Sequence, residues 1–196
     1  MIKFCIWDIG NTTYEYSLDP LHEWLLRHSQ NKEETAKKSK PFSFDSYMLG
    51  NSSFENVCKE LCDFYSTEYF SGIEIKINQL LHQGVGEYIQ ETAEVRRIMK
   101  NTGIINGILS NALPCLSDTL KYDDFDKRFC FTSYQMHLLK PDIRIFETLL
   151  KNLQCQANEV IFVDDKKKNI DAASALGIYA VQYIPGLFME QMESYL

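Results

Sequence analysis

The apolar positions divide the chain into two kinds of segment. Residues 2–7 form a short apolar run that stops at Asp8, Gly10 and Asn11, which is typical of a buried strand reaching the rim of a parallel sheet. From about residue 19 to 92 the apolar residues recur at helical spacing, and period-two alternation is almost absent. The pattern therefore predicts one strand followed by a helical insertion.

Three groups of apolar residues carry the helical spacing of this insertion: Leu21, Trp24 and Leu25; Phe54, Val57, Leu61, Phe64 and Tyr65; and Ile75, Ile77, Leu80 and Leu81. The polar stretch 29–41 is predicted to join two of these helices. Its lysines are expected to form a solvated face.

From residue 94 onward, predicted helices and strands alternate. The helices are expected at 94–100, 113–120, 142–153 and 169–176, and the strands at 104–109, 129–132, 160–163 and 179–183. Such alternation indicates a parallel sheet with helices on both faces. The prediction is an α/β fold, a doubly wound parallel-sheet (Rossmann-like) core built from 1–14 and 91–196, with an α-helical unit inserted at 15–90.

Composition and charge narrow the functional classes. With 196 residues and 45% hydrophobic content, the chain is long enough for one core plus a small inserted unit. A net charge of −7 and a pI near 5.1 argue against broad binding to nucleic acid or an anionic membrane. The run 2–7 is too short for a signal peptide, so a cytoplasmic protein is expected, as a monomer or homodimer.

Six cysteines stand at positions 5, 58, 62, 115, 130 and 155. Cys58 and Cys62 lie four apart in a helical pattern, and no His or second Cys pair follows at a zinc-ligand spacing. They are interpreted as core thiols, without a disulfide framework.

Polar side chains follow the predicted strands where each one ends. Asp8 follows the first strand, Ser110 the second, and Asp164 and Asp165 a later one, while a loop brings Lys140. Because parallel strands deliver their carboxyl ends to one edge of the sheet, these residues are expected to surround one small anion.

Each residue type suits a separate task at that edge. A carboxylate is a competent nucleophile toward phosphorus or activated carbon. Two further carboxylates with a backbone carbonyl suit Mg²⁺, which prefers oxygen ligands. A Ser hydroxyl, backbone N–H groups and a Lys ammonium can hold phosphoryl oxygens.

Four ordered signatures carry a resemblance to a known family: WDIGNT at the first strand, ILSN at 108–111, LKPDIRIF at 139–146 and VIFVDDKKKN at 160–169. With these signatures on the expected elements, nearly the whole chain resembles the haloacid dehalogenase-like (HAD) hydrolases, most of which are Mg²⁺-dependent phosphatases. Residues 15–90 match the position of the family's small helical cap.

The resemblance implies a role for each site residue. Asp8 would be the nucleophile that forms an aspartyl-phosphate on a small phosphorylated metabolite, such as a sugar phosphate. The other implied roles are phosphate binding by Ser110, Asn111 and Lys140, Mg²⁺ binding by Asp8, the Gly10 carbonyl, Asp164 and Asp165, and support of this cluster by Asn169.

One position departs from the family pattern. Most phosphatases of the family carry a second Asp two residues after the nucleophile, which protonates the leaving alcohol, and here that position is Gly10. A missing acid is worth about 10²–10⁴ in rate. Some sugar-phosphatase relatives share this Asp-x-Gly-Asn form, whereas a phosphoglucomutase needs the absent Asp.

Other chemistries of the family remain open. Dehalogenases usually have an aromatic residue at the position of Gly10 and need no metal, and the retained Asp164 and Asp165 argue against them. A phosphonate-cleaving relative would need a cap lysine, for which the candidates are Lys32, Lys37, Lys38, Lys40, Lys59 and Lys76. A weakly catalytic member that only binds a phosphorylated ligand is the third alternative.

Several side chains outside the four signatures are further candidates. His137 could replace the lost acid, although a loop His is more often a surface residue. His22 and His28 are expected to face water, and Lys166, Lys167 and Lys168 to be solvated. The cap aromatics Trp24, Tyr47, Phe54 and Tyr65 are interpreted as packing residues.

Substrate discrimination is expected to reside in the helical insertion, because the four signatures serve groups that every phosphomonoester shares. Candidate specificity positions are His22, Arg27 and Tyr47. Hinges are expected near 14–18 and 90–93.

Overall fold

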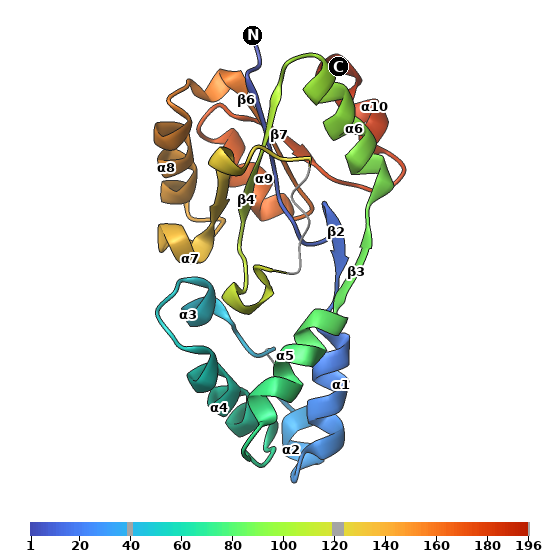
Figure 1. Cartoon of the computed structure of the whole chain (residues 1–196), viewed down its shortest axis with the longest axis vertical. Coiled ribbons are helices and arrows are strands. Elements are labelled where there is room, and N and C mark those ends of the chain that lie inside the picture. Colours follow the sequence, from blue (N-terminus) through green and yellow to red (C-terminus); the bar gives the residue numbers. More distant parts are fainter. Residues whose placement is uncertain (39–40, 119–123, 196) are drawn as a thin grey trace.

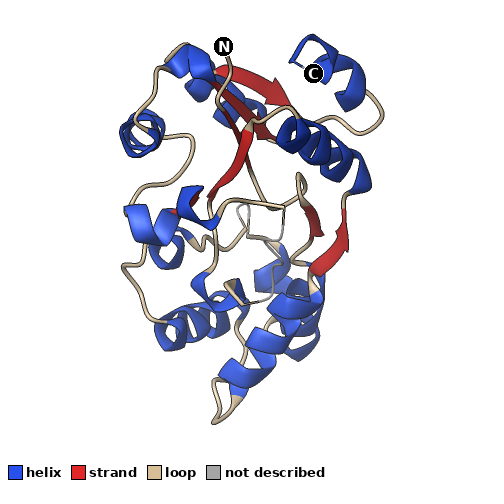
Figure 2. Ribbon diagram, turned by 45° about the horizontal axis from the view of Figure 1, so that its top comes forward, coloured by secondary structure: helices blue, strands red, loops and turns tan. Residues whose placement is uncertain are grey.

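The computed structural model describes residues 1–38, 41–118 and 124–195. A parallel sheet with helices on both sides forms one part of the molecule, and a group of helices forms the other (Figures 1 and 2). A cavity that contains the strand ends lies between the two parts.

The sheet has five strands in the order β5-β4-β1-β6-β7, and each neighbouring pair is parallel. Their bounds are β1 Phe4–Trp7, β4 Ile105–Ser110, β5 Cys130–Thr132, β6 Val160–Asp164 and β7 Tyr179–Gln182. Trp7 pairs with Ile108 on one side and with Val163 on the other. This register brings the ends of the three central strands to one level, as the doubly wound prediction requires.

The central strand is buried on both faces, which explains its unbroken apolar run. Phe4 and Ile6 join a cluster with α8 (Ile143–Leu153) and α9 (Lys167–Ser174). Cys5 and Trp7 join the cluster on the other face, which includes α6 (Gln90–Asn101) and α10 (Phe188–Met192). Figure 1 shows α8 on one side of the sheet and α6 with α10 on the other.

The remaining short elements of this part are α7 (Ser133–Met136) and the 3₁₀ turns η1 (Pro114–Leu116), η2 (Lys127–Phe129), η3 (Ala157–Glu159) and η4 (Glu193–Tyr195). Helix α8 begins one residue later than expected because Asp142 is its N-cap, and the Asp142 side chain accepts a hydrogen bond from the Arg144 N–H.

The helical segment comprises α1 (Asp19–His28), α2 (Lys32–Ala36), α3 (Asp45–Met48), α4 (Phe54–Tyr65) and α5 (Ile73–Gln83). Its helices pack around a core of their own, in which Leu25, Cys58 and Cys62 are fully buried. All six cysteines of the chain are free, in agreement with the interpretation as thiols.

A two-stranded antiparallel ribbon joins the helical segment to the sheet. It pairs β2 (Tyr14–Tyr16) with β3 (Val85–Tyr88). At one end the Ile89 N–H donates to the Thr13 carbonyl, and at the other the Ser17 N–H donates to the Gly84 carbonyl. Both crossings between the two parts of the chain therefore run side by side (Figure 1).

Three sequence expectations differ from the structure. The ribbon strand β3 was not expected, since its four residues show no alternation of burial. Ile75 was placed on the apolar face of α5, yet it is 67% exposed, and Ile73 takes that place in the core. The polar stretch 29–41 contains the short helix α2, capped by Asn31, whose side chain accepts from the Glu34 N–H.

The helix expected at 113–120 is also different. The structure has only the 3₁₀ turn Pro114–Leu116 there, and residues 119–120 lie outside the described part of the chain. Leu113 and Leu116 pack into the core of the helical segment, so tertiary packing replaces the expected helix.

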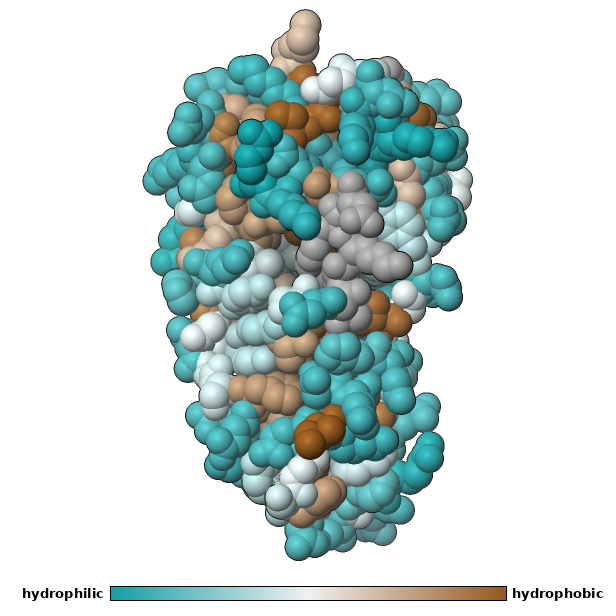
Figure 3. Space-filling view, viewed as in Figure 1, coloured by the Kyte–Doolittle hydropathy of each residue, from teal (hydrophilic) through white to brown (hydrophobic). Residues whose placement is uncertain are grey.

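The surface is ordinary for a folded chain. Hydrophilic side chains cover most of the face shown in Figure 3, and apolar ones occur there in small patches. Within the described ranges, no helix is both long and apolar enough to cross a bilayer.

Candidate active site

Asp8 lies directly after β1, at the edge of the sheet that faces the cavity. It is 5% exposed. Its N–H donates to the Val163 carbonyl at 2.8 Å, and its carbonyl accepts from the Thr13 hydroxyl at 2.8 Å. The main chain on both sides of the carboxylate is therefore held in place.

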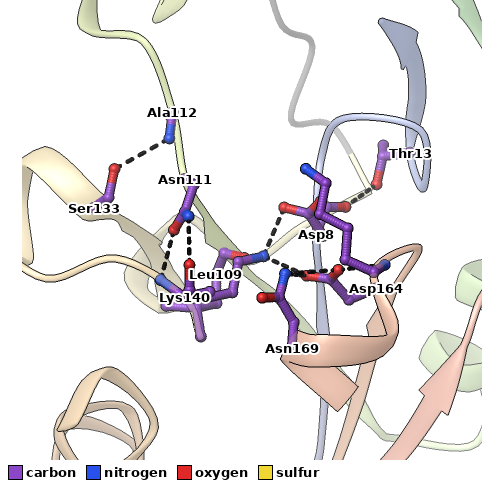
Figure 4. A network of polar contacts seen from close by, with 10 residues as sticks. Asp8, Thr13, Leu109, Asn111, Ala112, Ser133, Lys140, Asp164 and Asn169 are labelled. Carbon is purple, nitrogen blue, oxygen red and sulfur yellow. Dashed lines mark hydrogen bonds and ion pairs between the residues drawn. The ribbon is translucent and has the colours of Figure 1, made fainter. Parts of the chain in front are cut away.

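Lys140 connects the ends of three strands. Its Nζ donates to Asp8 Oδ1 at 2.7 Å, to the Leu109 carbonyl at 2.7 Å and to Asp164 Oδ2 at 2.6 Å. Figure 4 shows the ammonium between the two carboxylates. The side chain is 1% exposed, so these three oxygens take up its three N–H groups away from solvent.

Asn111 positions the backbone of Lys140. Its amide donates to the Lys140 carbonyl at 2.9 Å and accepts from the Lys140 N–H at 2.9 Å. Asn111 was predicted to bind phosphate, but its side chain is used for this pairing. Its contribution to the site is to fix the loop from which the lysine extends.

Asp164 is fully buried and accepts hydrogen bonds on both oxygens. The Lys166 N–H donates to Oδ1 at 2.9 Å, and the Asn169 amide donates to Oδ1 and Oδ2 at 2.9 Å each. Asn169, on the first turn of α9, therefore orients this carboxylate (Figure 4).

Asp8, Asp164 and Asp165 form an acidic cluster. Each offers an oxygen, and these oxygens lie within 4.8 Å of one another. Asp165 Oδ1 and Asn169 Oδ1 are buried without a hydrogen-bond partner in the described part of the chain. Because buried oxygens normally have partners, these two mark a place where a cation or another donor fits.

The charges of the cluster do not cancel. The three carboxylates face one ammonium, that of Lys140, so the ionised cluster carries two negative charges in excess. A divalent cation would neutralise this excess with hard oxygen ligands.

The pKa values at the site follow burial and these neighbouring charges. Burial raises the pKa of Asp8, an effect that Lys140 opposes and Asp164 reinforces. Burial alone would lower the pKa of Lys140, but the Asp8 and Asp164 carboxylates outweigh it and raise that pKa. Burial, together with the charge of Asp8, raises the pKa of Asp165 to about 6.

Ser110 ends β4 beside this cluster and is 4% exposed. It lines the cavity, as do Gly10 and Asn111. Every strand end singled out in the sequence is therefore present at one edge of the sheet.

Two residues were missed by the sequence analysis. Thr13 secures the carbonyl of Asp8, and the buried Ser133 accepts from the Ala112 N–H at 3.1 Å, which fixes the loop after Ser110. Ser133 directly follows β5, so the strand-end rule used for the other residues could have identified it.

The cavity has a volume of about 630 Å³, within the range of small-molecule sites. Its floor is formed by the strand ends and by Lys166 and Lys168, and the opposite side by residues of the ribbon and the helical segment. Lys167, in contrast, pairs with Asp171.

The expected specificity positions are wrong. His22, Arg27 and Tyr47 are not among the residues that line the cavity, whereas Leu18, Phe42, Phe44 and Met48 are. His22 instead meets the Tyr65 hydroxyl at 2.7 Å, and Tyr47 is buried in the core of the helical segment.

His137 is also remote from the site. Its Nδ1 donates to the Leu49 carbonyl at 2.8 Å, so this nitrogen carries a proton and links the loop before α8 to the end of α3. His137 does not line the cavity. The geometry gives no support to His137 as a replacement acid.

Solved structures show the same fold. A HAD family enzyme from Bacteroides thetaiotaomicron, in complex with magnesium and inorganic phosphate, matches with a TM-score of 0.75 and 18% identity over 95% of this chain and 96% of that one. A predicted HAD-like family hydrolase from Porphyromonas gingivalis matches with a TM-score of 0.77 and 20% identity, over 100% of this chain and 98% of that one. The L-2-haloacid dehalogenase of Xanthobacter autotrophicus matches with a TM-score of 0.63 and 15% identity, over 99% of this chain and 83% of that one.

Curated relatives match over shorter stretches. A sesquiterpene phosphatase of Aspergillus oryzae is 37% identical over 67 residues, which are 34% of this chain and 33% of that protein. Acyl-CoA dehydrogenase family member 10 of Mus musculus is 42% identical over 45 residues, 23% of this chain and 4% of that protein. The chain thus spans about a third or less of the length of these relatives.

Residues 25–182 match a family model, that of the haloacid dehalogenase-like hydrolases. This match covers more than half of the 196 residues. The chain therefore belongs to the haloacid dehalogenase-like hydrolase family.

Proposed function

We propose that the protein is a Mg²⁺-dependent phosphatase that hydrolyses small phosphomonoesters through an aspartyl-phosphate on Asp8. One observation carries the proposal: the Asp8 carboxylate is held by Lys140 within an acidic cluster that also contains Asp164 and Asp165. A nucleophile that shares a cation site with two further carboxylates suits phosphoryl transfer.

The donor set fits magnesium. Asp8, Asp165 and the Gly10 carbonyl would hold the ion, with Asp164 beside them. The unpartnered Oδ1 of Asp165 and the excess of two negative charges support this assignment. When bound, Mg²⁺ would polarise the phosphoryl oxygens and offset their charge.

The residues of the chain divide the reaction between them. An Asp8 oxygen attacks phosphorus, the bond from phosphorus to the ester oxygen breaks, and that oxygen leaves with the bonding electrons and takes its proton from water. Water then attacks the phosphorus of the acyl phosphate, which releases inorganic phosphate and restores Asp8. Lys140 fixes the rotation of the carboxylate through its bond to Oδ1.

Binding of the phosphoryl group falls to Ser110, to Lys140 and to the backbone N–H of Asn111. The ammonium of Lys140 already serves three protein oxygens, so a phosphoryl oxygen has to share one of its N–H groups. Such charge-assisted bonds would hold the transferred group in line with Asp8.

The alternatives are supported less well. A dehalogenase has no use for the Asp164–Asp165 pair. A phosphonate-cleaving enzyme needs an amine over the site, and no lysine from the described residues of the helical segment lines the cavity; Lys40 lies outside the described residues. The similarity to a sesquiterpene phosphatase of Aspergillus oryzae also supports phosphatase chemistry.

Residues 15–90 are proposed to act as a cap on a catalytic core of 1–14 and 91–196. The helical segment closes one side of the cavity, and closure would exclude stray water from the acyl phosphate.

The test is the turnover of p-nitrophenyl phosphate with Mg²⁺. Asp8→Asn, which keeps the shape and removes the nucleophile, should abolish turnover, and so should a chelator. Asp171→Asn, an exposed carboxylate paired with Lys167, should leave turnover unchanged and serves as the matched control.

A beryllofluoride adduct on Asp8, detected by mass spectrometry or fluorine NMR, would support the acyl phosphate. Asp8→Asn with wild-type turnover would contradict the mechanism. Tight phosphate binding without turnover would favour the third alternative, a weakly catalytic member of the family.

A further inference from the structure

The cavity changes character from one end to the other. At the strand ends it is lined by Asp8, Ser110, Lys140 and Asn169. On the opposite side lies a surface that we call the apolar wall, formed by Leu18, Phe42, Phe44, Met48, Leu113 and Leu116. The phosphoryl group and the remainder of a substrate would therefore meet different chemistries.

The apolar wall is built into the core of the helical segment. Phe44, Leu113 and Leu116 are buried, and they belong to the core cluster against which Phe42 and Met48 pack. The Phe42 and Phe44 rings meet edge to face, with centroids 5.0 Å apart. This part of the surface is consequently held in shape before a ligand arrives.

The same stretches also carry polar side chains. Ser43, Asp45 and Ser117 line the cavity but are exposed. Tyr16 is the exception, because its hydroxyl is buried without a partner among the described residues. Burial raises the pKa of Tyr16, so the hydroxyl stays neutral.

We propose that the phosphatase substrate is a monophosphate of an apolar alcohol, with an alkyl or aryl body and not a sugar, seated against the apolar wall. This inference rests on the proposed function. A sugar seated against the apolar wall would place hydroxyls against side chains that carry no polar group, and each hydroxyl that loses its water without gaining a partner costs roughly 5- to 150-fold in affinity. A hydrocarbon body would gain up to about fourfold for each methylene buried.

Turnover and binding test the inference together. The first probe is a pair of esters, cyclohexylmethyl phosphate and glucose 6-phosphate. Both release a primary alcohol from a six-membered ring, so the leaving groups are similar and the ring hydroxyls are the main difference. The kcat/KM should be at least tenfold higher for the cyclohexylmethyl ester.

The second probe is inhibition by n-alkylphosphonates from butyl to octyl, measured against Mg²⁺-dependent turnover of acetyl phosphate. The inhibition constant should fall by twofold to fourfold per methylene. Phe42→Ser should flatten this dependence, because the variant removes an aromatic ring from the apolar wall. Met48→Gln is the second wall variant if Phe42→Ser does not fold.

Ile75→Ser is the matched control. Ile75 is apolar and lies on the helical segment, but it is 67% exposed and does not line the cavity. The control should keep the wild-type dependence on chain length.

The outcomes separate this inference from the proposed function. Acetyl phosphate turnover with a flat phosphonate series, or with glucose 6-phosphate as the better ester, overturns the apolar substrate and leaves the phosphatase intact. If no phosphate ester is hydrolysed, the proposed function fails. Calorimetric titration of the phosphonates in Mg²⁺ then decides the apolar preference, which fails if affinity does not rise with chain length.

Discussion

At the scale of single residues, Gly10 departs from the motif that the resemblance leads one to expect after Asp8. It lies two residues after Asp8 and lines the cavity, so it occupies the place where a general acid would stand. A Cβ atom built on Gly10 would find its nearest neighbour, the Tyr16 Cβ, at 3.8 Å. The backbone therefore has room for a side chain, so steric crowding does not explain why an acid is missing at this position.

Gly10→Asp is expected to restore the proton donor. In the unaltered protein, rates should fall steeply as the pKa of the leaving alcohol rises, because nothing protonates the departing oxygen. The variant should raise turnover of alkyl phosphates by up to about 10²–10⁴-fold and change p-nitrophenyl phosphate little. The measurement is kcat/KM over esters of graded leaving-group pKa.

Gly10→Asn controls for shape, since it adds a similar side chain without an acidic proton. It should keep the steep dependence on leaving group. His137→Ala should also keep it, because His137 bonds to Leu49 away from the cavity. A flat dependence in the unaltered protein would mean that another acid serves the site.

Lys140 is the residue on which the electrostatics of the site depend. Its removal leaves the buried Asp8 and Asp164 carboxylates without their shared counter-charge. Lys140→Met should therefore cost about 3–5 kcal/mol of unfolding free energy. Denaturant unfolding in chelator measures the loss.

Lys3→Met is the matched control, because Lys3 also pairs with a carboxylate, Glu159, at 2.6 Å, but at the surface. Exposed pairs contribute about 0–1 kcal/mol. Equal losses of unfolding free energy in the two variants would show that the Asp8 and Asp164 carboxylates do not depend on the charge of Lys140 for stability.

At the scale of elements, strands with unbroken apolar runs were predictable and the ribbon was not. The runs before Asp8 and Asp164 are buried on both faces of the sheet, so burial alone defines them. The ribbon strands β2 and β3 are short and half exposed. These strands form because they pair with each other across a long stretch of sequence. Such pairing produces no recognisable hydrophobic pattern in either short segment.

The same distinction applies to the site. Asp8, Ser110 and Asp164 could be placed from the sequence because the parallel topology itself brings strand ends together. The residues facing them across the cavity could not. Phe42 and Met48 line it through packing of the helical segment, whereas the polar positions chosen in the sequence point elsewhere.

The ribbon also contains the tightest backbone contact between the two crossings. A Cβ on Gly84 would lie 2.0 Å from the Ser17 carbonyl oxygen, and the Gly84 carbonyl accepts from the Ser17 N–H at 2.9 Å. Gly84→Ala has to push the two chains apart.

The expected cost of Gly84→Ala is about 1–3 kcal/mol of unfolding free energy, as for other overpacked sites, and calorimetry or denaturant unfolding measures it. Gly10→Ala, whose Cβ meets only an ordinary contact at 3.8 Å, should change stability by much less. Similar stabilities for both variants would show that the ribbon adjusts freely and does not act as a fixed joint.

At the scale of the whole molecule, three contacts among the described residues join the helical segment to the part that contains the sheet. The ribbon is one, and the His137 bond to Leu49 is another. The third is the pair Leu113 and Leu116, which leave the end of β4 and enter the core of the helical segment.

The charge surplus of the acidic cluster has a thermodynamic consequence. A phosphate dianion brought to Asp8 meets three clustered carboxylates, two of which contact one ammonium, with Lys166 and Lys168 elsewhere in the cavity lining, on a protein whose net charge is −7. Magnesium and phosphate should consequently bind as cooperative ligands, and by linkage each must raise the affinity for the other by the same factor.

Calorimetric titration of phosphate with and without Mg²⁺, and of Mg²⁺ with and without phosphate, measures both sides of this cycle. We expect a factor of about 5–150, typical of coupled sites. Equal phosphate affinity in chelator and in magnesium would refute the coupling. If the factor holds, Mg²⁺ raises the affinity of the site for product phosphate. Product inhibition by phosphate should therefore become stronger as the concentration of free Mg²⁺ rises.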